Sequence, residues 1–117
     1  VTIVGTHLTK PYDELVAWQE MAELRRLLDG IEGPVVLAGD FNSTIWTESV
    51  GTLMERARLV PGPSTPATWP VRLGALGVPI DNMFTRDNAR VLTLESGESY
   101  GSNHRPLWAS IGLYAAE

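Results

Sequence analysis

The fold is decided by residues 34–42, which read PVVLAGDFN. Residues 35–38 are apolar without a break, and they lack the polar alternation of a half-exposed strand. This pattern is typical of a central β-strand that is covered on both faces. Two oxygen-bearing side chains, Asp40 and Asn42, follow directly and stand two residues apart. In extended backbone they share a side, while Phe41 between them points into the packing.

Strand and helix patterns alternate around this strand. Residues 1–5 are apolar and β-branched, as in a buried strand. Residues 14–29 carry apolar side chains at three- and four-residue steps, which predicts an amphipathic helix that Gly30 ends. The further elements expected are a helix that Thr47 or Ser49 caps and that runs to Ala57, a long irregular loop over residues 61–79, and strands over residues 80–85, 91–94 and 107–113. This order predicts an α+β fold or an α/β sandwich.

Length and composition fit a single globular domain. The chain has 117 residues, of which 44% are hydrophobic, and its formal net charge is −5. No apolar run approaches the ~20 residues that span a bilayer, so no membrane segment is expected within these residues. The nine lysines and arginines are scattered apart from the pair Arg25 and Arg26, which disfavours tight nonspecific binding to nucleic acid. The excess of acidic over basic residues favours the binding of cations over the binding of polyanions.

The absence of certain motifs narrows the chemistry. The chain contains no cysteine, which excludes a disulfide, a thiolate metal site and a thiol nucleophile. Its glycines form neither a phosphate-binding P-loop nor a dinucleotide-binding motif, and no Gly-x-Ser-x-Gly nucleophile motif is present. Hydrolysis by this chain would therefore use an activated water.

Polar clusters stand where the predicted strands end. They are Thr6-His7, Gly39-Asp40-Phe41-Asn42 and Ser102-Asn103-His104. Strand ends are where a rigid scaffold delivers side chains into a shared cleft. Histidine transfers protons near neutral pH when a carboxylate orients its ring. Asp81 is the expected partner, because a charged side chain just inside an apolar strand needs a hydrogen-bonding or oppositely charged partner.

Each of these residues also has a purely structural interpretation. Asp40 and Asn42 readily bond their own backbone in a turn. Asp81 is able to bind a backbone amide or Arg105, and a lone histidine is more often a satisfied structural group than a catalyst. The pattern of residues leaves these alternatives open.

Four motifs, in this order, resemble those of the endonuclease/exonuclease/phosphatase superfamily. They are Gly5-Thr6-His7-Leu8, Gly39-Asp40-Phe41-Asn42, Ile80-Asp81-Asn82-Met83-Phe84 and Ser102-Asn103-His104-Arg105-Pro106. The superfamily folds as two packed β-sheets flanked by helices. The resemblance implies half of this four-layer α/β/β/α sandwich, with a mixed, mainly antiparallel sheet and two helices on one face. Residues 1–117 are expected to be the C-terminal half of such a domain, cut from a longer chain.

The resemblance implies a metal-dependent attack of water on a phosphate ester. Asp40 would orient or deprotonate the water, and Asn42 would hold it or a phosphate oxygen. His104, oriented by Asp81, would contact the scissile phosphate or transfer a proton. His7 would meet the phosphate or protonate the leaving oxygen.

The implied metal site departs from the family pattern at one position. A hard cation, Mg²⁺ or Mn²⁺, would be bound by Asp40, Asn42 and Asn103. The family commonly has Ser-Asp-His where this chain has Ser102-Asn103-His104. Asn103 keeps an oxygen ligand but loses a negative charge, which weakens the attraction for a divalent cation. Two hypotheses follow: a hydrolase of phosphate esters of phosphodiesterase or nuclease type, and a catalytically degenerate module that binds a phosphate ligand or serves as a scaffold.

Substrate, partners and location are less defined. Nucleic acid, a phospholipid head group and a sugar phosphate are all open as substrates. One half of a two-sheet sandwich would expose an apolar sheet face and unpaired strand edges, so we expect the isolated chain to associate with itself. The loop with Trp46 and Trp69 is similar to bacterial relatives, some of which carry membrane segments upstream. The compartment therefore stays undetermined, and membrane association of the parent protein stays open.

Overall fold

The computed structural model describes residues 1–9 and 14–115. The elements in chain order are β1 (Thr2–His7), α1 (Glu14–Asp29), β2 (Val35–Asp40), α2 (Glu48–Arg56), β3 (Val60–Pro61), the 3-10 helix η1 (Val71–Leu76), β4 (Asp81–Arg86), β5 (Ala89–Ser96) and β6 (Leu107–Leu113). The expected bounds of α1 and β6 are confirmed, and the other expected strands differ by one or two residues at their ends. Thr47 is the N-cap of α2, because its Oγ1 accepts a hydrogen bond from the Val50 N–H (3.4 Å). Among the described residues, no helix has the length and apolar character needed to cross a membrane.

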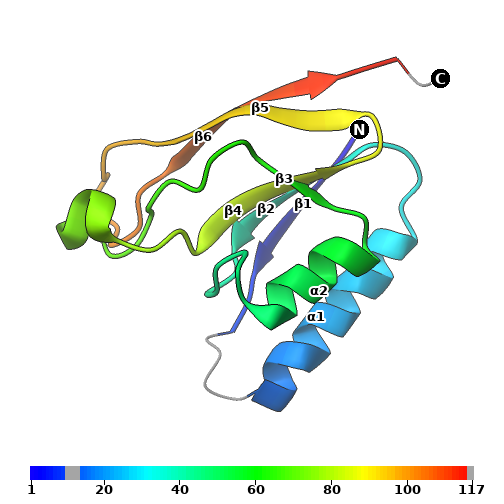
Figure 1. Ribbon diagram of the computed structural model, residues 1–117, viewed down its shortest axis with the longest axis horizontal. Helices are drawn as coiled ribbons and strands as arrows, with labels where there is room; N and C mark the ends of the chain where they lie inside the picture. Colours follow the sequence, from blue (N-terminus) through cyan, green and yellow to red (C-terminus); the bar gives the residue numbers. More distant parts are fainter. Residues whose placement is uncertain (10–13, 116–117) are drawn as a thin grey trace.

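Four strands form one mixed sheet in the order β1-β2-β4-β3. β1 and β2 are parallel, whereas β4 runs antiparallel to both β2 and β3. Helices α1 and α2 lie together on one face of this sheet, and β5 and β6 form a separate antiparallel hairpin on the other side (Figure 1). The α+β class, with a mixed and mainly antiparallel sheet and two helices on one face, is confirmed.

β2 is the central strand, as its unbroken apolar run predicts. Val35 and Leu37 have no exposed surface and belong to the core cluster under the helices. Val36 points to the opposite face, where it is only 6% exposed. Burial on both faces explains why this strand shows no polar alternation.

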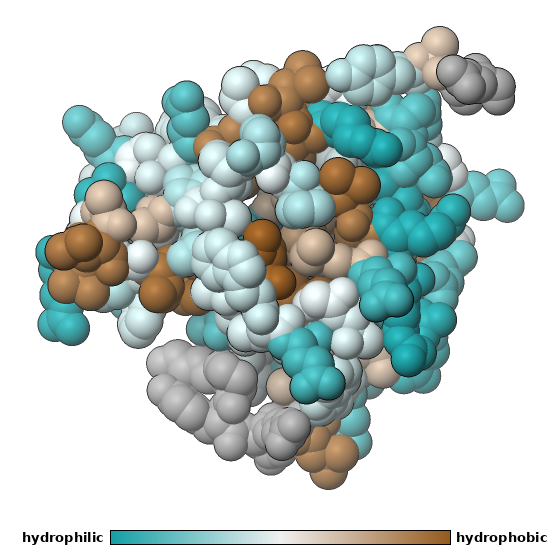
Figure 2. Space-filling model, in the orientation of Figure 1, coloured by the Kyte–Doolittle hydropathy of each residue, from teal (hydrophilic) through white to brown (hydrophobic). Residues whose placement is uncertain are grey.

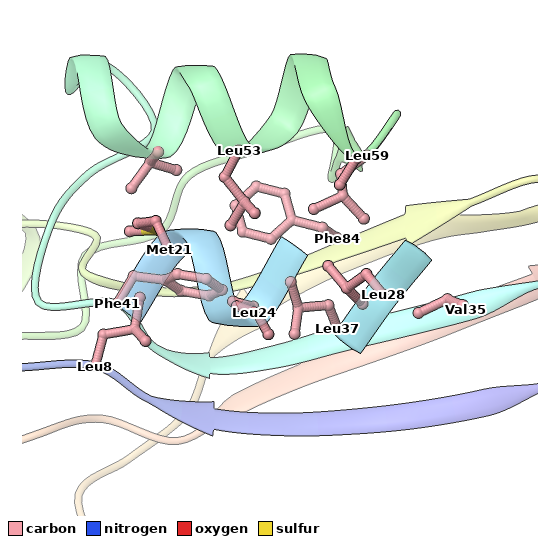
Figure 3. Close-up of a cluster of buried hydrophobic side chains, with 12 residues drawn as sticks. Leu8, Met21, Leu24, Leu28, Val35, Leu37, Phe41, Leu53, Leu59 and Phe84 are labelled. Atoms are coloured by element: carbon pink, nitrogen blue, oxygen red, sulfur yellow. The ribbon is translucent and has the colours of Figure 1, made fainter. Parts of the chain in front are cut away.

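The core fills the space between the helices and the sheet, where Leu28 of α1 and Leu53 of α2 point toward the strands (Figure 3). Phe41 and Phe84 pack edge to face within it, with ring centroids 5.1 Å apart and planes at 87°. Such aromatic pairs contribute about 0.5–1.5 kcal/mol beyond the area they bury. The buried Phe41 ring anchors the chain immediately after β2, and with it the neighbouring Asp40.

A buried arginine attaches the sheet to the end of α1. Arg86 is 2% exposed, and its guanidinium donates hydrogen bonds to the carbonyl oxygens of Leu28 (2.8 Å) and Ile31 (2.9 Å). The last carbonyl groups of a helix have no partner within the helix and carry partial negative charge, so a cation there is favourable. No pattern in the sequence predicts this contact.

The proline-rich segment over residues 61–79 is more ordered than the irregular loop that the sequence predicts. It contains η1, and Trp69 forms an isolated antiparallel bridge with Val78. Thr68 is fully buried, and its Oγ1 accepts a hydrogen bond from the Asp81 N–H (3.2 Å). These bonds attach the segment to the beginning of β4.

Candidate active site

Three of the predicted site residues stand in one row across the sheet. His7 is the register partner of Asp40 on the parallel strand β2, and Asp40 is the register partner of Asp81 on the antiparallel strand β4. β1 and β2 both end at this row, and β4 begins there. The strand pairing alone therefore brings three polar side chains to the same edge of the sheet.

Asp40 lies at the centre of the row. Its side chain is 17% exposed, and its Oδ2 lies 3.5 Å from His7 Nε2 and 3.8 Å from His104 Nε2. Its Oδ1 accepts a hydrogen bond from the Asn42 N–H (2.8 Å). The structural interpretation of Asp40 as a turn former therefore holds for one of its oxygens, while the other faces both histidines.

Glycine is required immediately before this aspartate. Gly39 has φ of 155°, and a Cβ at this position would overlap the carbonyl oxygen of Thr6 on the neighbouring strand. The close approach of the two backbones holds the ends of β1 and β2 together. It thereby fixes the relative positions of His7 and Asp40.

The second histidine is oriented by a carboxylate. His104 Nδ1 lies 2.7 Å from Asp81 Oδ2, and the side chains of the two residues are 27% and 18% exposed. An ionised carboxylate only accepts hydrogen bonds, so Nδ1 donates and Nε2 is the ring atom turned toward Asp40. The backbone on both sides is fixed as well: the Asp81 N–H donates to Thr68 Oγ1, and the His104 N–H donates to Ser102 Oγ (3.0 Å).

The two asparagines border the same space. The side-chain NH₂ of Asn42 donates to the carbonyl oxygen of Leu8 (2.6 Å), which leaves its Oδ1 as the available acceptor. Asn42 has φ of 49°, so a turn, rather than the extended backbone that the sequence analysis assumes, places it beside Asp40. Asn103 is exposed, and its backbone carbonyl accepts a hydrogen bond from the Val71 N–H (2.9 Å).

All the predicted site residues line one hollow of about 820 Å³, called the catalytic hollow below; they are His7, Asp40, Asn42, Asp81, Asn103 and His104. His7 is the most open of the titratable groups, with 79% of its side chain exposed. Trp69 also lines the hollow, although no motif in the sequence marks it as a site residue. Its indole ring lies beside the His104 ring, with centroids 6.4 Å apart.

The donor groups in the hollow fit a hard cation. One ligand atom each from Asp40, Asp81 and His104 lie within 4.8 Å of one another. Two half-buried carboxylates this close repel each other, and a cation between them relieves the repulsion. Carboxylate and amide oxygens are the ligands that Mg²⁺ and Mn²⁺ prefer. Because Asp81 already accepts a hydrogen bond from His104, Asp40 is the carboxylate best placed to bind a cation.

A family model for the endonuclease/exonuclease/phosphatase family matches residues 2–110. The chain belongs to this family. The recognition made from the four motifs is therefore confirmed, and the family's members are hydrolytic phosphoesterases.

Solved structures of this endonuclease/exonuclease/phosphatase fold superpose on the chain at low sequence identity. A functionally unknown conserved protein from Enterococcus faecalis V583 has a TM-score of 0.80 at 18% identity, with 96% of this chain and 50% of that chain covered. A mannosyl-6-phosphatase from Bacteroides thetaiotaomicron has a TM-score of 0.66 at 15% identity, with coverages of 95% and 51%. Beta toxin from Staphylococcus aureus, a double mutant with bound magnesium ions, has a TM-score of 0.63 at 15% identity, with coverages of 92% and 51%.

The chain spans about half the length of these solved proteins. Among curated protein sequences, none matches it significantly.

Proposed function

We propose that this chain carries the catalytic hollow of a metal-dependent phosphoesterase, which cleaves phosphate esters with an activated water in the full-length protein. One observation carries the proposal: Asp40 faces both histidines, and one of these, His104, is oriented by a second carboxylate. Family membership supports phosphoester hydrolysis as the reaction.

Asp40 is the residue that orients or deprotonates the attacking water. Its Oδ1 is fixed by the Asn42 N–H, so its Oδ2 has a defined direction into the catalytic hollow. Half-burial keeps the carboxylate away from bulk water and strengthens its interactions with charged neighbours. A general base held in this way contributes roughly 10²–10⁴-fold to the rate of hydrolysis.

The two histidines stabilise the negative charge of the phosphate and transfer protons to or from it. Asp81 holds the His104 ring so that Nε2 faces the space in front of Asp40, where it stabilises the charged phosphate or moves a proton. His7, at the exposed mouth of the hollow, contacts the phosphate or protonates the leaving oxygen.

Asp40 and the side-chain oxygens of Asn42 and Asn103 are the residues that would hold Mg²⁺ or Mn²⁺. The cation would neutralise the negative charge of the phosphate, which otherwise repels an attacking water. The bound magnesium ions of the structurally similar beta toxin support this choice of metal.

Asn103 favours a second candidate, a degenerate module on the same fold that binds a phosphate ligand without turnover. An asparagine in the catalytic hollow supplies an oxygen but no charge, so the metal is bound less strongly than by an aspartate. Thermal stabilisation by a phosphate ligand, with no hydrolysis in the presence of Mg²⁺ or Mn²⁺, would favour this candidate.

The test is the hydrolysis of bis(4-nitrophenyl) phosphate by the full-length protein, with Mg²⁺, with Mn²⁺ and with EDTA. We expect activity that EDTA abolishes and that His104→Ala reduces by roughly 10²–10⁴-fold. The matched control is Asp29→Asn, which alters an exposed carboxylate on α1 and should leave the rate unchanged. A folded wild-type protein with neither cation binding nor turnover contradicts the proposal.

A further inference from the structure

A second hollow opens directly beside the catalytic one. It measures about 560 Å³, and its lining includes Pro70, Arg72 and Ser102. We call it the side hollow. Trp69 and Asn103 line both hollows, so a group bound in one lies next to a group bound in the other.

Trp69 is held rigidly at this junction. Its N–H donates to the Val78 carbonyl (3.2 Å), and its own carbonyl accepts from the Val78 N–H (2.7 Å). A Cβ on Gly77 would come within 2.8 Å of the Trp69 carbonyl oxygen, so glycine is needed for this close approach. On the other side, the buried Thr68 accepts a hydrogen bond from Asp81. The Trp69 backbone is therefore fixed by contacts within the chain, at the point from which the indole reaches both hollows.

The indole ring remains available to a ligand. Trp69 is 36% exposed although it lies beside the His104 ring. A preformed aromatic surface beside a phosphate site is suited to stacking on a flat ring, and such stacking does not depend on the identity of the base. The ring that stacks would be part of the substrate that carries the phosphate.

Arg72 gives the side hollow a positive charge, whereas the catalytic hollow beside it carries negative charges. Among the described residues that line the two hollows, Arg72 alone is an arginine or lysine, and it is exposed and has no ion pair within the described part of the chain. The catalytic hollow carries the carboxylates of Asp40 and Asp81. A second anionic group on the substrate is therefore attracted to the side hollow and repelled from the catalytic one.

We propose that the side hollow binds a nucleoside esterified to the scissile phosphate, with its base stacked on Trp69 and a second phosphate on its sugar bound by Arg72. This inference rests on the proposed phosphoesterase function and names its substrate class. A competing substrate is a phospholipid, because Leu73 and Leu76 of η1 are exposed apolar side chains. The helix η1 lies at one end of the molecule (Figure 1), where Figure 2 shows hydrophobic atoms at the surface. The net charge of −5 does not assist binding to an anionic membrane, and a lipid head group leaves Trp69 without a stacking partner.

The experiment compares esters that share one leaving group, 4-nitrophenol, and differ in the group that stays on the phosphate. These groups are methyl, choline, thymidine and thymidine 3′-phosphate. We expect the full-length protein to prefer the two thymidine esters. Trp69→Ala should lower kcat/KM for them by roughly 10- to 100-fold more than for the methyl ester, the loss expected for one stacked base. Trp69→Phe should retain most of the preference. The matched control is Trp46→Ala, since Trp46 is 70% exposed and lines neither hollow.

Arg72 is tested with the same set of esters. Arg72→Gln should lower kcat/KM only for thymidine 3′-phosphate, by roughly tenfold. Arg58→Gln, at an exposed arginine outside both hollows, should change no ester.

Three outcomes overturn the inference. The first is an equal loss of kcat/KM for all esters in Trp69→Ala, which would show that the indole only supports the shape of the hollow. The second is a preference for the choline ester that Leu76→Asp abolishes, which would assign the site to a lipid surface. The third is a wild-type protein that hydrolyses the methyl and thymidine esters equally well.

Failure of the proposed function is distinguishable from failure of this inference. If no ester is hydrolysed, calorimetric titration with thymidine 3′,5′-bisphosphate tests the side hollow without turnover. Binding by the wild type that is lost in both Trp69→Ala and Arg72→Gln supports the inference, and absence of binding by the wild type overturns it. Circular dichroism of each variant shows whether it is folded.

Discussion

His104 Nδ1 and Asp81 Oδ2 lie 2.7 Å apart, although the residues are 23 positions apart in the chain. This bond joins the loop before β6 to the first residue of β4. It also directs His104 Nε2 toward Asp40. The pair is therefore both a structural connection and the orienting element of the candidate active site.

Asp81→Asn should distinguish a role of Asp81 in orienting the His104 ring from a role in binding the metal ion. The amide removes the charge that holds His104 in one tautomer, so we expect kcat to fall by roughly 10²–10⁴-fold. Because Asp40 and the asparagines are the proposed ligands, the affinity for Mn²⁺, measured by electron paramagnetic resonance, should fall only about tenfold, which is the effect of one nearby charge. A variant that loses Mn²⁺ binding as well would show Asp81 to be a metal ligand.

Asn103→Asp should strengthen cation binding. The substitution adds a negative charge to the catalytic hollow, which Asp40 also lines. We expect the dissociation constant of Mn²⁺ to fall about tenfold, which corresponds to about 1.4 kcal/mol. Calorimetry measures this directly. Gln19→Glu adds the same charge on the exposed surface of α1 and serves as the control. Equal cation affinities for Asn103→Asp and wild type would remove Asn103 from the proposed metal site.

Arg86→Met should destabilise the fold without touching the candidate site. The variant leaves the Leu28 carbonyl in the last turn of α1, and the Ile31 carbonyl just after it, without their guanidinium donor. The expected cost is about 2–4 kcal/mol in the free energy of unfolding. Urea unfolding followed by circular dichroism measures this loss. Arg26→Met, on the exposed side of the same helix, should cost less than about 0.5 kcal/mol. Equal losses for the two variants would refute the role given to Arg86.

The 117-residue chain should associate with itself. An apolar groove lies between the sheet and β6, with Ile3 73% exposed on one wall and Trp108 62% exposed on the other. In a pure solution only a second copy is present to cover this groove, so we predict dimers at micromolar concentration in analytical ultracentrifugation. The double variant Ile3→Glu/Trp108→Glu should be monomeric. Leu27→Glu, at an exposed leucine of α1, should remain associated. A monomeric wild type rules out this association.

The sequence predicts the parts of the site that lie on regular strands. An apolar run that ends in Gly-Asp-x-Asn marks β2 and Asp40 together, because the same strand supplies the core and the polar residue. The register of neighbouring strands then brings His7 and Asp81 to the same edge. Local periodicity carries this information, since side chains alternate along a strand.

The sequence does not predict contacts that only the folded chain creates. Arg86 directly follows the expected strand over residues 80–85, yet it is buried. Its guanidinium donates to the Leu28 carbonyl in the last turn of α1 and to the Ile31 carbonyl just after the helix. Trp69 lies in a proline-rich segment with no periodic pattern. Its position depends on backbone bonds to Val78 within that segment, and on the bond between the neighbouring Thr68 and Asp81 of β4. The sequence around Arg86 and Trp69 contains no pattern that identifies the residues they contact in the folded chain.

The central claim is that Asp40 and His104 act on the same reacting phosphate, and a double-mutant cycle tests it most directly. The measurement is kcat of the full-length protein for bis(4-nitrophenyl) phosphate in Asp40→Asn, His104→Ala and the double variant, each with saturating Mg²⁺. Residues of one catalytic unit are not additive, so the double variant should be no slower than the slower single variant. If instead the two losses multiply, the residues act independently and the proposed catalytic hollow is contradicted.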